Sequence, residues 1–256
     1  MMNKRSPKWY GWLPDLPDQR DFMYSAVAPK LLRLPPKVDL RSKCPPVENQ
    51  GALGSCTANA LAGALEFLEL KDGAPFIDLS RLFIYYNERV IEGTVDQDSG
   101  AFLRDGIKSL AKRGVCPEKQ WPYRIADFEQ KPVRACYTAA KKHQITSYRR
   151  IATTDEMRTC LADGFPFVFG FTVYSAFESD TVARSGVVNL PARNEQVLGG
   201  HAVVCVGYDD SQKRFIARNS WGADWGQKGY FTIPYAYLGN QNLADDFWTI
   251  RAAENG

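Results

Sequence analysis

The stretch QGALGSCTANALAGALEFLEL, residues 50–70, joins a glycine-rich turn to a long apolar run. From residue 61 to residue 68 the apolar residues recur at i, i+3, i+4 and i+7, the spacing of one helix face. Gly73 supplies a stop, so we expect a helix from about residue 56 to residue 71. Ser55 and Cys56 would then lie at or near its N-cap, where unpartnered N–H groups and the helix dipole favour a thiolate. Cys56 is therefore a candidate nucleophile, although free cysteines are as commonly small, buried and inert.

A catalytic cysteine needs a base, and the chain has two histidines, His143 and His201. His143 lies in the basic, polar segment AAKKHQITSYRR (139–150), so we expect it at the surface. His201 follows two glycines and precedes an apolar run, residues 202–206, that is typical of a short buried strand. It can face a cleft from there, or it can be a satisfied core histidine. Asn219 ends a second β-rich run, and its neighbour Trp221 could shield a buried polar contact from water.

Three stretches in this order resemble the papain-like cysteine peptidases: VDLRSKCPPVENQGALGSC (38–56), HAVVCVGYDD (201–210) and NSWGADWGQKGY (219–230). The six-residue step from Gln50 to Cys56 also matches the family. Within the family, the sequence is most similar to bacterial members. The resemblance covers the chain from about residue 34 to its end. It implies an α+β, two-lobed fold, with a helical N-terminal lobe, a β-rich C-terminal lobe and the active-site cleft between them.

The resemblance also implies a role for each of these residues. Cys56 would attack the peptide carbonyl as a thiolate paired with the His201 imidazolium. The side chain of Asn219 would orient the imidazole, and Trp221 would cover the Asn219–His201 hydrogen bond. The side-chain amide of Gln50 and the backbone N–H of Cys56 would bind the oxyanion.

Substrate binding is implied for a further segment, Ser99-Gly100-Ala101. In the family this segment pairs its backbone with an extended substrate near the residue two before the cut, so Gly100 and Ala101 are candidates. The family usually has a second glycine where Ala101 stands. Leu53 replaces a cysteine that usually lies three residues before the nucleophile, so the disulfide of that cysteine is absent. Thr57 replaces the usual aromatic residue after the nucleophile.

The first 33 residues are expected to form an extended, prosegment-like region ahead of a peptidase domain of residues 34–256. Dense prolines exclude a helix there, and apolar side chains on an extended segment must dock on something. One hypothesis is that part of the segment lies across or beside the cleft and limits access. The other is a strand packed on the back of the domain. The residues concerned are Trp9, Tyr10, Trp12, Leu13, Pro14, Leu16 and Pro17.

The remaining pattern places helices first and strands later, which favours an α+β fold. Beyond residue 71 we expect a helix capped by Ser80, a helix over 99–113 stopped by Gly114, and a short helix over 155–162. Residues 115–150 are expected to be rich in loops. The expected strands are 165–173, 201–208, 214–220, 229–233 and 247–251. The buried face of the helix after Ser80 is expected to hold Leu79, Leu82, Phe83, Tyr86 and Val90.

Composition excludes several classes of function. The 256 residues carry a formal net charge of +3, and no basic run is interleaved with aromatic residues, which argues against nucleic acid as a partner. No apolar stretch is long enough to span a membrane, and the N-terminus lacks the apolar core of a signal peptide. The basic clusters at residues 141–143 and 149–150 are expected to be solvated surface.

The cysteine content points away from metal and redox chemistry. The six cysteines form no CxxC pattern, and two histidines are too few for a zinc-like cluster, so we expect no metal and no cofactor. If Cys56 is the free nucleophile, at least one further cysteine is unpaired, and Cys205 is expected to be inert core. This suits a reducing compartment, such as the cytoplasm, better than a secreted domain, but localisation stays open.

The leading interpretation is a monomeric cysteine endopeptidase that acts on protein or peptide substrates, with protein inhibitors as further partners. The alternatives are an exopeptidase of the same family, a catalytically silent peptide-binding domain, and a thiol redox protein. Asp245 or Asp246 would favour basic substrate residues if it lay in the specificity pocket. We expect both instead to be solvated charges outside it.

Overall fold

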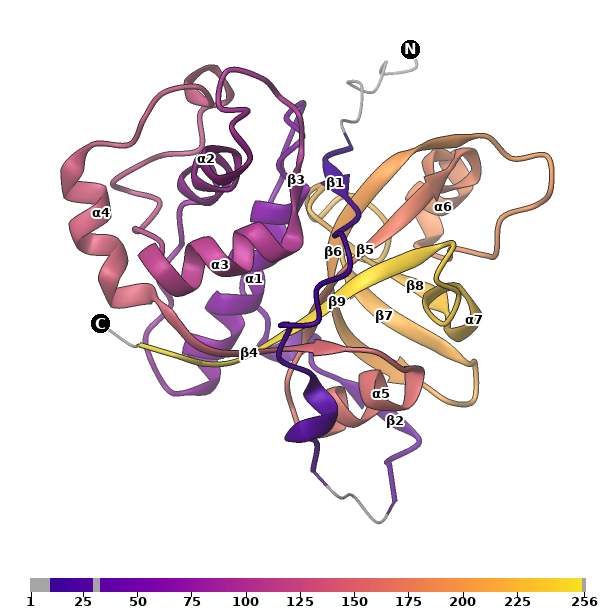
Figure 1. The fold of residues 1–256 in the computed structure, drawn as a ribbon. Coiled ribbons are helices and arrows are strands. Elements are labelled where there is room, and N and C mark those ends of the chain that lie inside the picture. Colours follow the sequence, from indigo (N-terminus) through magenta and orange to yellow (C-terminus); the bar gives the residue numbers. More distant parts are fainter. Residues whose placement is uncertain (1–9, 30–32, 255–256) are drawn as a thin grey trace.

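The computed structural model describes residues 10–29 and 33–254, which fold into two lobes (Figure 1). One lobe is helical, and the other is built on an antiparallel sheet, which confirms the expected α+β, two-lobed fold. Residues 1–9, among them Trp9, and residues 30–32 and 255–256 lie outside the described residues. The helical lobe consists of α1 (Cys56–Lys71), α2 (Arg81–Glu92), α3 (Leu103–Arg113) and α4 (Arg134–Ala140).

The sheet of the second lobe has seven strands in the order β4-β9-β5-β6-β7-β8, with β2 paired to β6 as well. Every pairing within it is antiparallel. The short helices α5 (Thr154–Ala162), α6 (Asp180–Ser185) and α7 (Tyr235–Leu238) accompany it. The strands are β2 (Lys37–Asp39), β4 (Ile145–Ile151), β5 (Phe167–Tyr174), β6 (Val197–Asp209), β7 (Arg214–Arg218), β8 (Tyr230–Pro234) and β9 (Ala244–Ala253).

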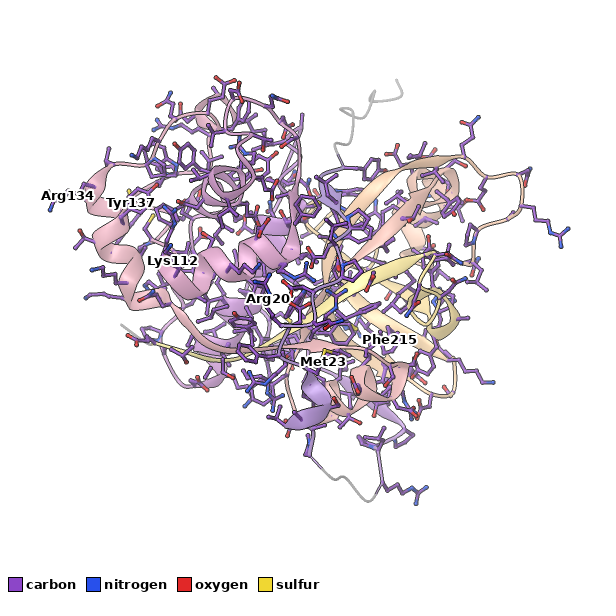
Figure 2. All side chains as sticks on the ribbon, viewed as in Figure 1. Arg20, Met23, Lys112, Arg134, Tyr137 and Phe215 are labelled. Atoms are coloured by element: carbon purple, nitrogen blue, oxygen red, sulfur yellow. The ribbon has the colours of Figure 1, made fainter. Side chains whose placement is uncertain are left out.

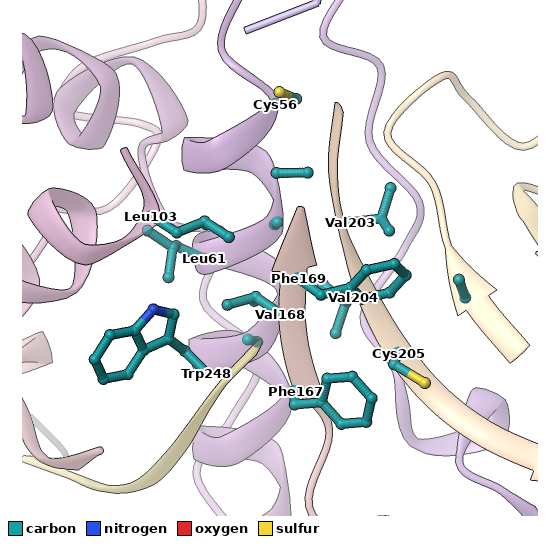
Figure 3. Close-up of a cluster of buried hydrophobic side chains, with 14 of the residues drawn as sticks. Cys56, Leu61, Leu103, Phe167, Val168, Phe169, Val203, Val204, Cys205 and Trp248 are labelled. Atoms are coloured by element: carbon teal, nitrogen blue, oxygen red, sulfur yellow. The ribbon is translucent and has the colours of Figure 1, made fainter. Parts of the chain in front are cut away.

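The helix α1 runs through the junction of the two lobes. Apart from its last two residues it is buried on every side, as expected for a helix whose apolar residues are not confined to one face. It packs on α2 and α3 in its own lobe and on β6 and β9 in the other. Figure 3 shows Leu61 of α1, Val168 of β5 and Trp248 of β9 within one cluster of buried hydrophobic side chains. The lobes therefore share one core, which fixes the start of α1 against the sheet.

Most predicted elements are confirmed, with shifts at their ends. The helix 56–71 is found as predicted, and the hydroxyl of Ser80 caps α2 by accepting a 3.1 Å hydrogen bond from the N–H of Phe83. The predicted helix 99–113 begins only at Leu103, because Ala101 and Phe102 form a short strand, β3. Val90 was wrongly placed on the buried face of α2, since its side chain is 37% exposed.

Residues 115–150 contain more structure than expected, namely α4 and β4. The strand β4 was missed because its sequence, ITSYRRI, is mostly polar. His143, predicted at the surface, is 4% exposed, and its Nδ1 lies 2.8 Å from Oε1 of Glu69 on α1. Arg150 is not a solvated cation either, because it binds the carboxylates of Asp245 and Asp246 on β9 and of Asp15 and Asp21 near the N-terminus. Charge in the sequence therefore marked exposure only in part: Lys141 and Lys142 are exposed as expected, whereas His143 and Arg150 bind carboxylates from distant parts of the chain.

Candidate active site

The turn before α1 is held by side chains from the rest of the helical lobe. The carboxylate of Asp98 accepts the backbone N–H of Gly54, with distances of 3.0 and 3.1 Å to its two oxygens. The hydroxyl of Tyr123 donates a 2.9 Å hydrogen bond to the carbonyl oxygen of Gln50. Gly51 has φ of +60°, a conformation that glycine adopts without strain. The loop therefore delivers Cys56 to the first position of α1, with Ser55 as the N-cap residue.

Gln50 connects the two lobes beside this turn. Its side chain is completely buried, and its Nε2 donates to the carbonyl oxygen of Leu53 at 3.0 Å. Its Oε1 accepts a 2.6 Å hydrogen bond from the hydroxyl of Ser220 in the β-rich lobe. The backbone N–H of Gln50 also donates to the carbonyl oxygen of Ser220, at 2.9 Å. The amide end of Gln50 is therefore fixed next to the start of α1.

His201 and Asn219 meet in the β-rich lobe. His201 lies on β6, and its Nε2 is 2.8 Å from Oδ1 of Asn219, just after β7. The backbone N–H of Ser220 donates to the same Oδ1 at 2.9 Å. Because this oxygen can only accept, the proton lies on Nε2, and Nδ1 of the neutral ring is the basic nitrogen. The ring of Trp221 covers the imidazole, with centroids 5.0 Å apart.

The thiol of Cys56 faces the strand that carries His201. Backbone groups of Gly11 and Ala202 hydrogen-bond to it, and Ala202 directly follows His201. The side chain of Cys56 is wholly buried, and this burial raises the pKa of the thiol to about 12. We expected the helix N-terminus to ease ionisation, but in this closed conformation desolvation outweighs the helix. Burial under the N-terminal segment therefore disfavours the thiolate.

The N-terminal segment runs between the two lobes, as Figure 1 shows. Its strand β1 (Trp12–Leu13) pairs in parallel with β3 (Ala101–Phe102), and the N–H of Ala101 donates to the carbonyl oxygen of Gly11 at 2.7 Å. A Cβ added to Gly11 would lie 1.7 Å from the carbonyl oxygen of Gly54, so the contact there is as close as a backbone permits. Tyr10 places its ring 6.1 Å from that of His201. Residues 10–13 thus lie over the thiol and the imidazole.

The segment continues into a cluster of charged side chains beyond the thiol. The segment brings Asp15, whose carboxylate is buried, and Asp21. The helical lobe contributes Arg104 on α3, whose guanidinium lies 2.7 Å from the carboxylate of Asp21 and 4.0 Å from that of Asp15. The β-rich lobe contributes Arg150 on β4, whose guanidinium lies 3.8 Å from the carboxylate of Asp15 and 2.9 Å from that of Asp246. Figure 2 shows Arg20 and Met23, further along the segment, over the junction of the lobes.

Asp246 corrects an expectation, because it is completely buried rather than solvated. Its Oδ2 accepts the indole N–H of Trp12 at 3.0 Å and the backbone N–H of Asp15 at 2.8 Å. The carboxylates outnumber the two guanidinium groups here. Burial, together with the neighbouring carboxylate, raises the pKa of both Asp15 and Asp246. Asp245, by contrast, keeps a side chain that is 42% exposed.

Of the residues singled out in the sequence, Cys56, His201, Asn219, Gln50 and Trp221 come together here. Gly100 and Ala101 lie against Gly11 of the segment. Two residues that shape the site, Asp98 and Tyr123, were assigned no role from the sequence, and Asp246 was expected to be a solvated charge outside the specificity pocket. An aromatic-proline turn pointed to the segment of Tyr123, but nothing in the pattern linked it to Gln50.

Among residues 10–29 and 33–254, no group of three or more His, Cys, Asp or Glu side chains is arranged to hold a metal ion. In the same part of the chain, no helix has both the length and the apolar character needed to cross a membrane.

A model of the papain family of cysteine proteases matches residues 34–247. The chain belongs to this family, and it is a papain-like cysteine peptidase. The match confirms what the three sequence stretches indicated, and it includes Gln50, Cys56, His201, Asn219 and Trp221.

Individual relatives agree with this assignment. The chain is 47% identical to xylellain, a cysteine protease from Xylella fastidiosa, with a TM-score of 0.90 over 98% of this chain and 99% of that one. It is also 47% identical over 214 residues to an uncharacterised peptidase C1-like protein of Acanthamoeba polyphaga mimivirus, covering 79% of this chain and 68% of that protein. The bromelain protease from Ananas comosus, solved with the inhibitor E64, shares the fold, with a TM-score of 0.67 at 22% identity over 87% of this chain and all of that one.

Proposed function

We propose that Cys56 is the nucleophile and His201 the general base and acid of this peptidase. Nδ1 of His201 takes the thiol proton, and the thiolate sulfur bonds to the peptide carbonyl carbon. The C–N bond then breaks as the imidazolium returns the proton to the leaving amine. Water, deprotonated by His201, displaces the sulfur and releases the acid. The observation that carries this proposal is the 2.8 Å contact between Nε2 of His201 and Asn219, which leaves Nδ1 as the base.

Gln50 and Asn219 serve this reaction without changing covalently. We assign to the side-chain amide of Gln50 and the backbone N–H of Cys56 the stabilisation of the oxyanion. This role is supported by the bonds that fix the Gln50 amide between Leu53 and Ser220. Asn219 holds the imidazole in one orientation and one tautomer, and Trp221 shields that hydrogen bond from water.

The enzyme is proposed to be an endopeptidase. Its own N-terminal segment crosses the cleft as an extended chain, with Tyr10 beside Trp221 on one side of the thiol and Trp12 on the other. A groove that accepts chain on both sides of the nucleophile suits an internal bond of a substrate. Gly100 and Ala101 would hold the substrate backbone where they now hold Gly11. Every group in the proposed mechanism comes from one chain, so the activity needs no second copy.

The N-terminal segment is proposed to act as a lid within a prosegment-like region of residues 1–33. It covers the thiol, raises the pKa of the thiol through burial and occupies the proposed substrate positions. Peptide hydrolysis therefore requires that residues 10–13 leave the cleft. Thiol-directed epoxides of the E64 type, and protein inhibitors that insert a chain into the cleft, would compete with the segment for the same space.

One experiment tests both parts of this proposal. The rate at which iodoacetamide alkylates Cys56 is measured in the full chain and in a variant whose segment cannot dock, alongside cleavage of internally quenched peptides. We expect slow alkylation and slow cleavage in the full chain, and both to rise together in the variant. Fast alkylation without cleavage would instead indicate a silent peptide-binding domain. Release of single terminal residues would indicate an exopeptidase.

A further inference from the structure

The indole of Trp12 occupies a pocket that two glycines make possible. Gly170 on β5 and Gly200 on β6 lie on neighbouring paired strands, close to His201. A Cβ on Gly170 would lie 1.9 Å from Cε2 of Trp12, and a Cβ on Gly200 would lie 2.7 Å from its Cε3. Any side chain at either position would fill the space that the ring now takes. The absence of a side chain at both positions therefore leaves the room that the indole of Trp12 occupies.

A single buried carboxylate closes the far end of this pocket. Asp246 has φ of +57°, a left-handed conformation that is uncommon for a residue with a side chain. Its Oδ1 is held by Arg150 at 2.9 Å. Its Oδ2 accepts the indole N–H of Trp12 and the backbone N–H of Asp15. Both donors to Oδ2 belong to the N-terminal segment, so both are lost when the segment leaves.

The charges that remain after this departure do not call for a cation. Asp15 and Asp21 leave with the segment, whereas Arg104 and Arg150 stay with the body of the protein. Two carboxylates, Asp245 and Asp246, remain beside them, and both lie within 3.0 Å of Arg150. The two positive and two negative charges then cancel. An arginine of the substrate would bring a third guanidinium beside those of Arg104 and Arg150. Oδ2 is then open to a new donor, and a neutral N–H that replaces the indole of Trp12 would restore its hydrogen bond without adding a charge to the cluster.

We infer that this pocket selects a tryptophan side chain of the substrate, with Asp246 reading the indole N–H as it now reads that of Trp12. The inference rests on the proposed function and names the substrate class of that site. Since Trp12 pairs with Ala101, the selected residue is the one whose backbone lies against Ala101. A phenylalanine there would fill less of the pocket and leave Oδ2 without a donor. An arginine would meet the guanidinium of Arg150.

The test uses the full-length chain carrying Gly11→Ala and Trp12→Ala, which removes both the close backbone contact and the plug. Fluorogenic dipeptide substrates differ only in the residue two before the cut, which is tryptophan, phenylalanine, arginine or benzothienylalanine. Benzothienylalanine has the shape of tryptophan with sulfur in place of N–H. We expect kcat/KM for tryptophan to exceed that for benzothienylalanine about tenfold or more, since a site built around a hydrogen bond rejects the analogue that lacks it.

Adding Asp246→Ala should bring the tryptophan-to-benzothienylalanine ratio close to one. The substrate pair carries the test alone if that variant does not fold. A ratio near one in the parent, or a preference for arginine, overturns the inference while leaving the peptidase proposal intact. If no substrate is cut, calorimetry with N-acetyl-tryptophanamide and N-acetyl-phenylalaninamide still decides, because tighter binding of the first supports the pocket and equal binding refutes it.

Discussion

The carbonyl oxygen of Gly11 accepts a 2.7 Å hydrogen bond from the N–H of Ala101, directly over the start of α1. The chain that makes this bond also supplies a backbone group to the thiol of Cys56. A segment that the sequence marks as extended and apolar thus ends up at the most reactive point of the molecule. The segment is bound in the cleft by the pairing of β1 with β3, by the buried indole of Trp12 and by the ion pairs of Asp15 and Asp21.

Replacing Gly11 by alanine should release the segment. The new Cβ would lie 1.7 Å from the carbonyl oxygen of Gly54, and backbone on both sides cannot give way. We expect iodoacetamide to alkylate Cys56 at least about tenfold faster in this variant. A loss of about 1.4 kcal/mol in the free energy of docking already changes the ratio of docked to undocked chains tenfold. Leu16→Ala is the matched control, since that side chain is 78% exposed on the same segment. An unchanged rate for Gly11→Ala would refute the lid.

Docking of the segment should weaken as pH rises. The pKa of Asp15 is raised to about 7, because burial and the Asp246 carboxylate outweigh the attraction of Arg104. In a segment that has left the cleft, this carboxyl returns to its ordinary pKa of about 4. The docked form therefore binds more protons between these two values. Protonation stabilises docking, and that stabilisation is lost as pH rises through about 7.

The measurement is the ratio of Cys56 alkylation rates in the full chain and in the Gly11→Ala variant, from pH 5 to pH 8. Taking the ratio removes the ordinary effect of thiol ionisation on the rate. The ratio should rise with pH, and Asp15→Asn should flatten it. Asp21, Asp245, Arg104 and Arg150 also face the cluster. A ratio that falls with pH would show that their ion pairs, rather than the buried carboxyls, govern docking.

Gln50 can be tested separately from its structural bond. In the Gly11→Ala background, Gln50→Ala should lower kcat by about 10²–10³, the usual cost of one oxyanion donor. Ser220→Ala removes the 2.6 Å hydrogen bond to Oε1 of Gln50 but keeps its amide N–H groups, so kcat should fall by much less. Equal losses in the two variants would mean that Gln50 acts only by joining the lobes.

The buried His143–Glu69 contact should matter for stability and not for catalysis. His143→Ala leaves the carboxylate of Glu69 buried without the ring that lies 2.8 Å away. We expect the free energy of unfolding to fall by about 1–3 kcal/mol, the cost of a buried polar group that loses its partner. Urea denaturation measures this change. The folded variant should cleave peptides with an unchanged kcat. A large drop in kcat would contradict a purely structural role for the His143–Glu69 contact.

The sequence predicted the parts of the site that are local. Cys56 at a helix start and His201 before an apolar run could be singled out because a turn or a period places each of them, but only the resemblance to papain-like peptidases implied their catalytic roles. Asn219 became a candidate through its position after a strand and its tryptophan neighbour. These residues needed no knowledge of what lay across the cleft.

The partners across the molecule could not be predicted in the same way. Asp246 and Arg150 look like solvated charges because their burial depends on Trp12 and Asp15, more than 130 residues away along the chain. His143 was misplaced for the same reason, since its partner Glu69 lies on a distant helix. The sequence indicated that Trp12 must dock on a surface, but only the structure shows that this surface is formed by Gly170 on β5 and Gly200 on β6.

Peptide cleavage by this protein should depend on Cys56 as the nucleophile. The decisive measurement is cleavage of an internally quenched peptide by the Gly11→Ala chain with and without Cys56→Ala. Loss of the nucleophile should remove at least three orders of magnitude in kcat, with the other five cysteines unable to compensate. Cleavage that persists at a comparable rate in Cys56→Ala would contradict the account.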